Sequence, residues 1–156
     1  MLTKRGVKPI TPYQHKFDNF YPFGAFSPIN GDSFLLEMPF CNTDTFQVYL
    51  QELSEQKPKE FKIIILDNGA FHHSKSLMIP KNMALLFLPP YSPELNPAER
   101  MWRFIKDRLA MKAFKNLEEI KSRISEIVKN DITNKRVKSI CNSELYYQSY
   151  QSILNV

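Results

Sequence analysis

Two carboxylates near the middle of the chain have the types and positions that metal chemistry requires. Asp67 follows the apolar run 61–66, and Glu99 lies near the start of a predicted helix. Carboxylate oxygens are the hard donors that Mg²⁺ prefers. In phosphoryl-transfer sites with two metals, ions held roughly 3.5–4 Å apart clamp the attacking and the leaving oxygen. The pair is therefore a candidate for metal-assisted phosphoryl transfer.

Each of these carboxylates also has an ordinary structural explanation. Asp67 begins an Asp-Asn-Gly sequence, which is common in turns. Glu99 stands three residues after Asn96 and has the spacing of a capping box. The two roles of Glu99 are compatible, because the helix dipole stabilises a carboxylate near the helix N-terminus. With the motif of residues 96–102 beside them, we predict that both residues are metal ligands.

An antiparallel pair of strands is predicted in the first third of the chain. Residues 21–26 are aromatic-rich and residues 33–38 are apolar, and Asn30-Gly31 between them is a strong hairpin turn signal. Pro22 favours an edge position for the first strand, because proline donates no backbone hydrogen bond. Residues 1–19 are polar and contain two prolines, so that we expect an irregular arm there.

A helix and a buried strand are predicted next. Asn42 can cap a helix, and its apolar face would consist of residues at i, i+3, i+4 and i+7: Phe46, Tyr49, Leu50 and Leu53. The run 61–66 contains three consecutive isoleucines and predicts a strand that is buried on both faces. Asp67 would then lie at the carboxyl end of a central strand, where open α/β sheets place their ligands.

The second half of the chain is predicted to be mainly helical. We expect a short helix over 74–78, a strand over 83–88, and a helix capped by Asn96 with Pro97 at its first position. Its buried stripe would be Ala98, Trp102, Ile105 and Leu109, and its other side would carry Glu99, Arg103 and Lys106. A further helix is predicted from Asn116, with Glu119 as its capping-box partner. A polar connection over 129–136 and a helical tail over 137–154 would follow.

The composition is that of one globular domain. The chain has 156 residues, of which 43% are hydrophobic, so that a packed core is feasible and general disorder is excluded. No run approaches the ~18 apolar residues of a membrane helix. The N-terminus lacks the apolar stretch of a signal peptide. Cys41 and Cys141 stand apart without metal-ligand spacing, which indicates a reducing, cytoplasmic compartment.

The net charge of +5 is concentrated in the last third of the chain. Residues 101–156 contain 11 Lys and Arg against 6 Asp and Glu, whereas the charges of residues 1–100 cancel. A basic C-terminal region is suited to phosphate contacts. A solvated helical face has the same composition, and the sequence leaves both interpretations open.

Residues 66–102 resemble the catalytic core of the mariner-type DDE transposases of bacterial insertion sequences. The matching pattern is D-N-x-x-x-H, then Y-S-P, then L-N-P-x-E-x-x-W. It falls on Asp67, Asn68, His72, Tyr91, Ser92, Pro93, Leu95, Asn96, Pro97, Glu99 and Trp102. The resemblance implies an α/β, ribonuclease-H-like fold with a mixed sheet flanked by helices. Residues 1–115 would form a partial catalytic core, and 116–156 a C-terminal helical extension of the same domain.

The resemblance also implies a function, which is metal-dependent cleavage and transfer of DNA strands. Asp67 and Glu99 would hold two Mg²⁺ or Mn²⁺ ions. Residues that would contact DNA or support the site are Asn68, His72, Tyr91, Ser92, Arg103 and Lys106. Structural alternatives stay open for most of them. Tyr91 and Ser92 could serve only to shape the loop, and Arg103 and Lys106 could lie on a solvated helix surface without contacting DNA. The partners would be transposon ends and target DNA, with no membrane, in a bacterial cytoplasm at the nucleoid.

One part of the family pattern has no counterpart in the sequence. The family has three acidic residues, and the first lies on an opening strand ahead of a segment that resembles residues 6–9. Asp18, Asp32 and Glu37 do not match its position. We therefore expect the first strand, its aspartate and the helix-turn-helix region to be missing. The chain would be impaired alone and would need an upstream transposase half or self-association.

Two other functions remain open at this stage. One is a catalytically dead DNA-binding or regulatory remnant of a transposase, which would bind DNA with a steep salt dependence and without metal. The other is a ribonuclease-H-like nuclease unrelated to transposition. The L-N-P-x-E-x-x-W pattern argues against the second.

Overall fold

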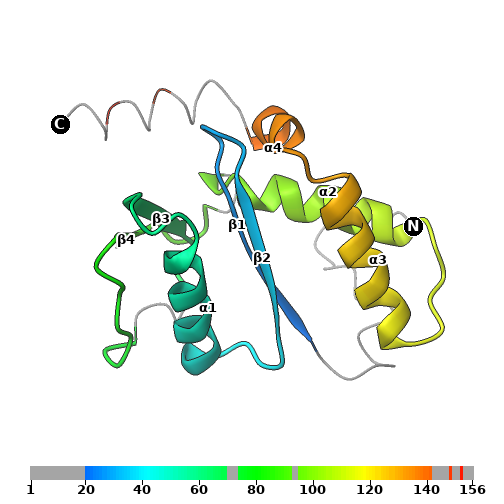
Figure 1. Cartoon of the computed structure of the whole chain (residues 1–156), viewed down its shortest axis with the longest axis horizontal. Coiled ribbons are helices and arrows are strands. Elements are labelled where there is room, and N and C mark those ends of the chain that lie inside the picture. Colours follow the sequence, from blue (N-terminus) through cyan, green and yellow to red (C-terminus); the bar gives the residue numbers. More distant parts are fainter. Residues whose placement is uncertain (1–19, 70–73, 93–94, 142–147, 149–151, 153–156) are drawn as a thin grey trace.

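The structure is a computed structural model, and it describes residues 20–69, 74–92 and 95–141, together with 148 and 152. Along these ranges two pairs of strands are separated by one helix, and three helices follow the second pair (Figure 1). The elements are β1 Tyr21–Phe26, β2 Ser33–Met38, α1 Thr43–Glu55, β3 Lys62–Leu66, β4 Met83–Phe87, α2 Ala98–Ala110, α3 Leu117–Asn130 and α4 Asn134–Cys141. The predicted mixed α/β class is confirmed. No helix within the described ranges is long and apolar enough to cross a membrane.

The predicted hairpin is confirmed. β1 and β2 pair antiparallel, from Tyr21 opposite Met38 to Phe26 opposite Ser33. Gly31 in the connecting turn has φ +80°, and a Cβ atom at this position would lie 2.1 Å from the carbonyl oxygen of Asn134. Glycine is required here both by the backbone conformation and by the close approach of α4.

The predicted start and buried face of α1 are also confirmed. The Asn42 side chain accepts a hydrogen bond from the Thr45 amide at 2.9 Å, and the Thr45 hydroxyl accepts one from the Asn42 amide at 3.2 Å. This reciprocal arrangement satisfies two amides that the helix leaves without partners. The buried residues of α1 include Phe46, Tyr49, Leu50 and Leu53.

The second pair of strands differs from the prediction. β3 and β4 pair in parallel, but within the described residues they form a two-stranded sheet that is separate from the hairpin. β3 is therefore an edge strand and not a central one. The expectation that its run is buried on both faces was wrong, because Ile63 is 44% exposed. Residues of one face, such as Ile64, pack on the α1 core, whereas Ile63, on the other face, belongs to neither hydrophobic cluster of the described residues.

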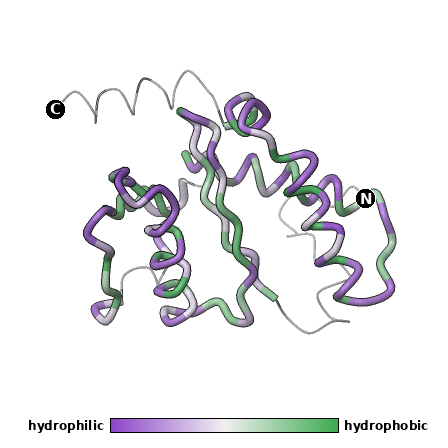
Figure 2. The backbone as a smooth tube through the Cα atoms, in the orientation of Figure 1, coloured by the Kyte–Doolittle hydropathy of each residue, from purple (hydrophilic) through white to green (hydrophobic). Residues whose placement is uncertain are grey.

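Two hydrophobic clusters hold the molecule together, one on each face of the hairpin. The first is centred on α1 and its buried members are Met38, Phe46, Tyr49, Leu50, Leu53 and Met83. The second lies among α2, α3 and α4, and its buried members are Met101, Ile105, Ile127, Ile132, Val137 and Cys141. Figure 1 shows α1 on one side of the hairpin and α2 and α3 on the other, and Figure 2 shows hydrophobic residues along both strands between them.

The short helix predicted over 74–78 is absent, and the structure shows a turn at residues 75 and 76. The physical reason is a competing set of hydrogen bonds. The amide of Met78 donates to the Gln47 side chain at 2.6 Å, and the Gln47 amide group donates to the Met78 carbonyl at 2.7 Å. These bonds hold the segment along α1 and engage the Met78 amide, which in a helix would donate to the carbonyl of Ser74.

Two of the helices, α2 and α4, begin at different positions from those predicted, whereas α3 begins after its Asn116 cap as predicted. α2 starts at Ala98, one residue later than expected. α4 starts at Asn134, inside the predicted polar connection, because Thr133 accepts the Val137 amide with its carbonyl at 2.9 Å and the Arg136 amide with its hydroxyl at 3.3 Å. Most of the predicted tail helix lies outside the described residues; residues 148 and 152 are helical.

Candidate active site

Asp67 and Glu99 line the same cavity, although they belong to different elements. Asp67 follows the last residue of β3, Glu99 lies in the first turn of α2, and both are exposed. The cavity has a volume of about 660 Å³. Its walls come from β1, β3, α1 and the start of α2, and Asn96, Pro97, Ala98 and Trp102 line it beside Glu99. The two carboxylates therefore have access to a common space.

The first turn of α2 is fixed by contacts on both sides of Pro97. The Asn96 side chain accepts the Ala98 amide at 3.1 Å, so that it caps the helix at Ala98 rather than at Glu99. The thiol of Cys141, in α4, donates to the Pro97 carbonyl at 3.8 Å, and burial raises the pKa of this thiol to about 11. These bonds hold the turn that carries Glu99, and the helix dipole favours its negative charge.

Trp102 joins α2 to the hairpin and has the core role that its position predicts. Its ring packs edge-on against Phe26, with centroids 5.7 Å apart. A Cβ atom at Gly24 would lie 2.9 Å from the same ring. Gly24 therefore lets α2 approach β1 closely. Sequence reasoning missed this role of Gly24, because a single glycine in a strand does not identify its neighbour.

The other predicted residues of the central motif lie away from the cavity or outside the described residues. Asn68 is exposed next to Asp67 but does not line the cavity. Tyr91 is fully exposed with φ +61°, and the Ser92 hydroxyl donates to the Pro90 carbonyl at 3.4 Å. The Ser92 contact supports a loop-shaping role. His72 lies outside the described residues.

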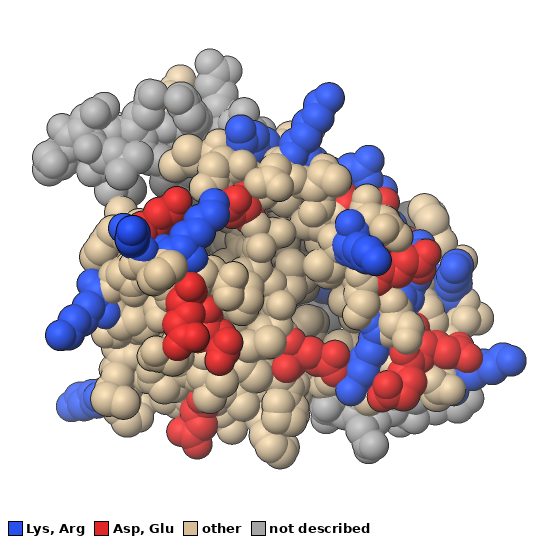
Figure 3. Space-filling model, viewed as in Figure 1, with Lys and Arg blue, Asp and Glu red and all other residues tan. Residues whose placement is uncertain are grey.

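Arg103 and Lys106 are exposed on α2 and do not line the cavity. Several other basic side chains of the C-terminal third form ion pairs. These pairs are Arg108–Asp131, Lys121–Glu37, Lys121–Glu118, Arg123–Glu126 and Arg136–Asp131. On the face shown in Figure 3, basic and acidic side chains alternate instead of forming one basic patch. The arrangement of this face favours a solvated helical surface.

Cys41 is a neighbour of the candidate site that the sequence did not reveal. Cys41 precedes α1 and is exposed as a residue. Partial burial of its thiol raises the pKa, and the carboxylate of Asp67 raises it further to a smaller extent. The negative charge of Asp67 is therefore felt at Cys41. No spacing in the sequence connects the two residues, since 25 positions separate them and only folding brings them together.

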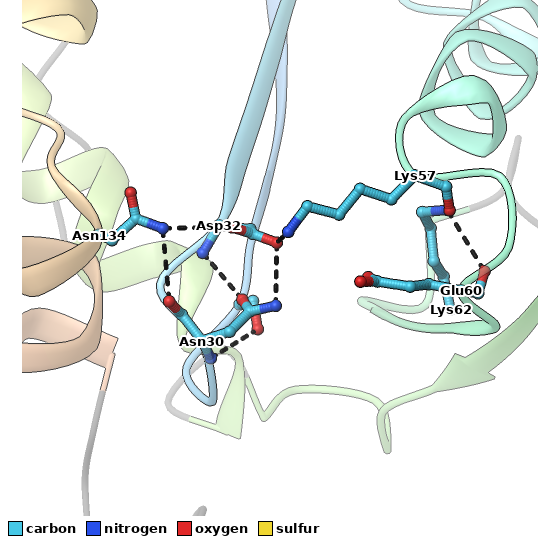
Figure 4. A network of polar contacts seen from close by, with 7 residues as sticks. Asn30, Asp32, Lys57, Glu60, Lys62 and Asn134 are labelled. Atoms are coloured by element: carbon cyan, nitrogen blue, oxygen red, sulfur yellow. Dashed lines mark hydrogen bonds and ion pairs between the residues drawn. The ribbon is translucent and has the colours of Figure 1, made fainter.

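The acidic residues weighed as substitutes for a missing ligand have other partners. Asp32 lines the cavity, but its carboxylate pairs with Lys57 and accepts hydrogen bonds from Asn30 and Asn134 (Figure 4). The hydrogen bond from Lys57 is the main reason why the pKa of Asp32 is lowered. Glu37 pairs with Lys121 at 2.7 Å. Asp18 lies outside the described residues.

The donors at the cavity fit a hard divalent cation in kind. Asp67 and Glu99 offer carboxylate oxygens, the ligands that Mg²⁺ and Mn²⁺ prefer. In the part of the chain that the structure describes, no three His, Cys, Asp or Glu side chains come together as a metal-binding group. The role of Asp67 and Glu99 as ligands therefore stays a prediction.

Comparisons with known proteins identify related chains. Residues 2–121 match a family model described as DDE superfamily endonuclease. An uncharacterized protein of Sinorhizobium fredii, y4pE/y4sA, is 38% identical over 102 residues, which are 64% of this chain and 76% of that protein. No solved structure matches the chain.

Proposed function

The chain belongs to the DDE superfamily of endonucleases, and on this premise we propose that it is a fragment of a transposase catalytic domain that acts in metal-dependent DNA strand cleavage and transfer. The family supports a transposase-like nuclease domain that acts on DNA. The observation that carries the finer proposal is that Asp67 and Glu99 line one cavity. The partners would be transposon ends and target DNA.

Asp67 and Glu99 would hold Mg²⁺ or Mn²⁺ between β3 and α2. Such an ion activates a water or a 3′-hydroxyl and stabilises charge on the phosphate. The chain's own contribution is to fix the two carboxylates, one by the β3–β4 ladder and the other by the contacts of Pro97 and Trp102 with α4 and β1. Asn68, His72, Tyr91, Ser92, Arg103 and Lys106 are proposed as DNA contacts or supports.

The proposal includes impaired activity of the isolated chain. The resemblance implies three carboxylates. Asp67 and Glu99 both line the cavity, while the carboxylate of Asp32 is engaged by Lys57 and two asparagines. A site with one ligand fewer binds metal more weakly and positions the nucleophile less well. An upstream transposase half would supply the rest. The division of the chain after residue 115 likewise stays a prediction.

Metal binding tests this proposal most directly. Isothermal titration with Mn²⁺ should show weak, saturable binding to the chain, and Asp67→Asn and Glu99→Gln should each abolish it. Glu60→Gln is the matched control, since Glu60 is also exposed and lines the same cavity. Binding that survives both ligand variants, or that is lost equally in Glu60→Gln, would contradict the assignment.

A cleavage assay separates the proposed function from its alternatives. The purified chain, supplied with Mg²⁺ and a duplex copied from the DNA that flanks its gene, should show little or no strand transfer. Robust cleavage that Asp67→Asn abolishes would overturn the proposed impairment. Cleavage of RNA–DNA hybrids alone would indicate an unrelated nuclease. DNA binding without metal, steeply dependent on salt, would indicate a non-catalytic DNA-binding remnant.

A further inference from the structure

The chain contains two Asn-Gly pairs, and both lie within the described residues. Asn30-Gly31 belongs to the hairpin turn, and Asn68-Gly69 directly follows Asp67. An asparagine that precedes glycine readily loses its side-chain amide, because glycine has no Cβ atom to obstruct the approach of its main-chain nitrogen. This nitrogen can attack the side-chain carbonyl carbon of the asparagine. In a folded chain the reaction depends on how each pair is held.

The pair in the hairpin turn is held in a way that opposes the attack. The Gly31 amide donates to the Ser27 carbonyl at 3.0 Å. The Asn30 side chain donates to the Asp32 carboxylate through its nitrogen and accepts the Asp32 amide through its oxygen, both at 2.9 Å (Figure 4). The side chain of Asn30 is therefore engaged by Asp32, and the nitrogen that would attack it is engaged by Ser27.

The same turn also has little freedom to change its shape. Gly31 has φ +80°, and a Cβ atom there would lie 2.1 Å from the carbonyl oxygen of Asn134. The Asn134 side chain donates to the Asn30 carbonyl at 3.4 Å. Ring closure requires the reacting atoms to approach to roughly 3–3.5 Å in the correct direction. A rotation that achieves this would break the contacts between the turn and α4.

The second pair lies outside the regular elements. β3 ends at Leu66, and residues 67–69 belong to no helix or strand. Asn68 is exposed, and Gly69 is half-buried. The Gly69 amide donates no backbone hydrogen bond within the part of the chain that the structure describes. The nitrogen that would attack is therefore available at Gly69, whereas it is engaged at Gly31.

We propose that Asn68 is a site of spontaneous deamidation and that Asn30 is protected from it. The Gly69 nitrogen forms a bond to Cγ of Asn68, the bond between Cγ and Nδ2 breaks, and Nδ2 leaves as ammonia with the proton of the Gly69 amide. Water then opens the five-membered imide ring. Attack of water at Cγ yields aspartate, and attack at the main-chain carbonyl carbon yields isoaspartate. Water is the only other reactant.

Gly69, rather than Asn68, makes this reactivity a property of the particular chain. The pattern D-N-x-x-x-H over residues 67–72 specifies the asparagine and leaves position 69 open. Among the glycines in the described residues, only Gly31 has a positive φ. Alanine is therefore compatible with the backbone at position 69. Gly69→Ala keeps Asn68 and adds the Cβ atom that obstructs the attack.

Either product places a second carboxylate beside Asp67, which lines the cavity together with Glu99. The consequence for metal rests on the proposed function, whereas the modification does not. Because affinity for hard cations rises with the charge of the ligands, Asn68→Asp should lower the Kd for Mn²⁺ by roughly threefold in isothermal titration. An unchanged or higher Kd would overturn this consequence for the metal site and would leave the modification to its own test.

Peptide mapping by mass spectrometry tests the modification itself. The full chain is incubated at pH 8 and 37 °C without metal or DNA, and the deamidated fraction is followed at both asparagines. Asn68 should react about tenfold faster than Asn30 or more, because exposed segments open at a lower free-energy cost than packed ones. The matched control is the same chain unfolded in guanidinium chloride. There the two rates should agree within about twofold, since each asparagine precedes glycine and the fold is lost.

The variant Gly69→Ala tests the route of the reaction. Its rate of deamidation at Asn68 should fall about tenfold or more, while the rate at Asn30 stays unchanged. A melting curve like that of the unmodified chain shows that the fold persists. Fragmentation of the peptide that contains position 68 should reveal both aspartate and isoaspartate, since water can open the ring at either carbonyl.

Three outcomes would overturn the proposed modification. Equal rates at Asn30 and Asn68 in the folded chain would show that the hairpin turn gives no protection. A rate at Asn68 that is far lower in the folded chain than in guanidinium chloride would show that the fold protects this pair as well. Unchanged deamidation in Gly69→Ala would exclude attack by the nitrogen of residue 69.

Discussion

The β1–β2 hairpin and the β3–β4 pair differ in how completely helices cover them. α1 packs on one face of each pair, and α2, α3 and α4 cover only the second face of the hairpin. Met101 and Ile127, in the cluster on that face, are fully buried, whereas Ile63 and Leu86 of the other pair are 44% and 38% exposed. The hairpin is the stable centre of the described structure, and the β3–β4 pair is its less protected part.

This difference places the two halves of the candidate site in unlike surroundings. Glu99 stands on α2, which Trp102 and Cys141 tie to the hairpin and α4. Asp67 stands on the less covered pair. The ion pair of Lys57 with Asp32 links the loop before β3 to the hairpin turn (Figure 4). The relative position of the two carboxylates therefore depends on a few contacts across the cavity.

The largest expected effect is the removal of a core side chain on the hairpin side. Met101→Ala should lower the free energy of unfolding by ~2–5 kcal/mol, because the buried side chain would leave a cavity. Leu86→Ala is the comparison on the β3–β4 pair and should cost less than ~1 kcal/mol, since this side chain is already partly in water. Urea denaturation monitored by circular dichroism measures both.

Equal losses of stability in these two variants would contradict the comparison. In that case the exposed face of the β3–β4 pair would be protected in solution.

The next largest effect concerns the hairpin turn. Gly31→Ala should destabilise the chain by more than the ~1–2 kcal/mol that a left-handed residue costs, because its Cβ would also meet Asn134 at 2.1 Å. Gly31→Asn separates the two causes. Asparagine tolerates positive φ but still carries a Cβ, so the variant should remain clearly destabilised in thermal melting. Recovery of wild-type stability by Gly31→Asn would show that the close approach to α4 costs nothing.

A smaller effect depends on pH and on the ion pair of Lys57 with Asp32 at the cavity. The pKa of Asp32 is lowered in the folded state, mainly by the hydrogen bond from Lys57. Its contribution to stability is therefore present above the unfolded pKa of about 3.9 and is lost as the pH falls through the folded value. Asp32→Asn should lower the melting temperature at pH 6, and the difference from wild type should shrink below about pH 4. A difference that stays constant from pH 6 to pH 3 would contradict a role for the ionised carboxylate.

The smallest effect reports on the charge of Asp67. The Asp67 carboxylate helps to raise the pKa of Cys41. Asp67→Asn should therefore lower that pKa and increase alkylation of Cys41 by iodoacetamide at pH 8, because the thiolate is the nucleophile and a lower pKa increases its fraction. Glu60→Gln is the control. Addition of Mg²⁺ to the unmodified chain should act in the same direction if the ion binds at Asp67, whereas unchanged alkylation in Asp67→Asn would show that the charge does not reach the thiol.

The sequence predicted those local features that depend on nearby residues. Asn42 and Asn116 cap α1 and α3 as expected, because each side chain accepts an amide three residues later. The hairpin followed from a turn signal between two apolar runs. The helix expected over 74–78 failed because Gln47, on another element, takes the backbone groups of Met78. Competition of this kind is invisible to a pattern in one segment.

The sequence by itself determined the class of elements, the family resemblance and the two carboxylates, since each depends on residue types at short spacing. Only the tertiary structure decided that Asp67 and Glu99 share a cavity, that Gly24 gives room to Trp102, and that β3 lies at an edge. The physical reason is that hydrogen-bond capping and periodicity act over a few residues. Which strand edges pair, and which side chains meet across a groove, depends on packing among segments that are distant in the chain.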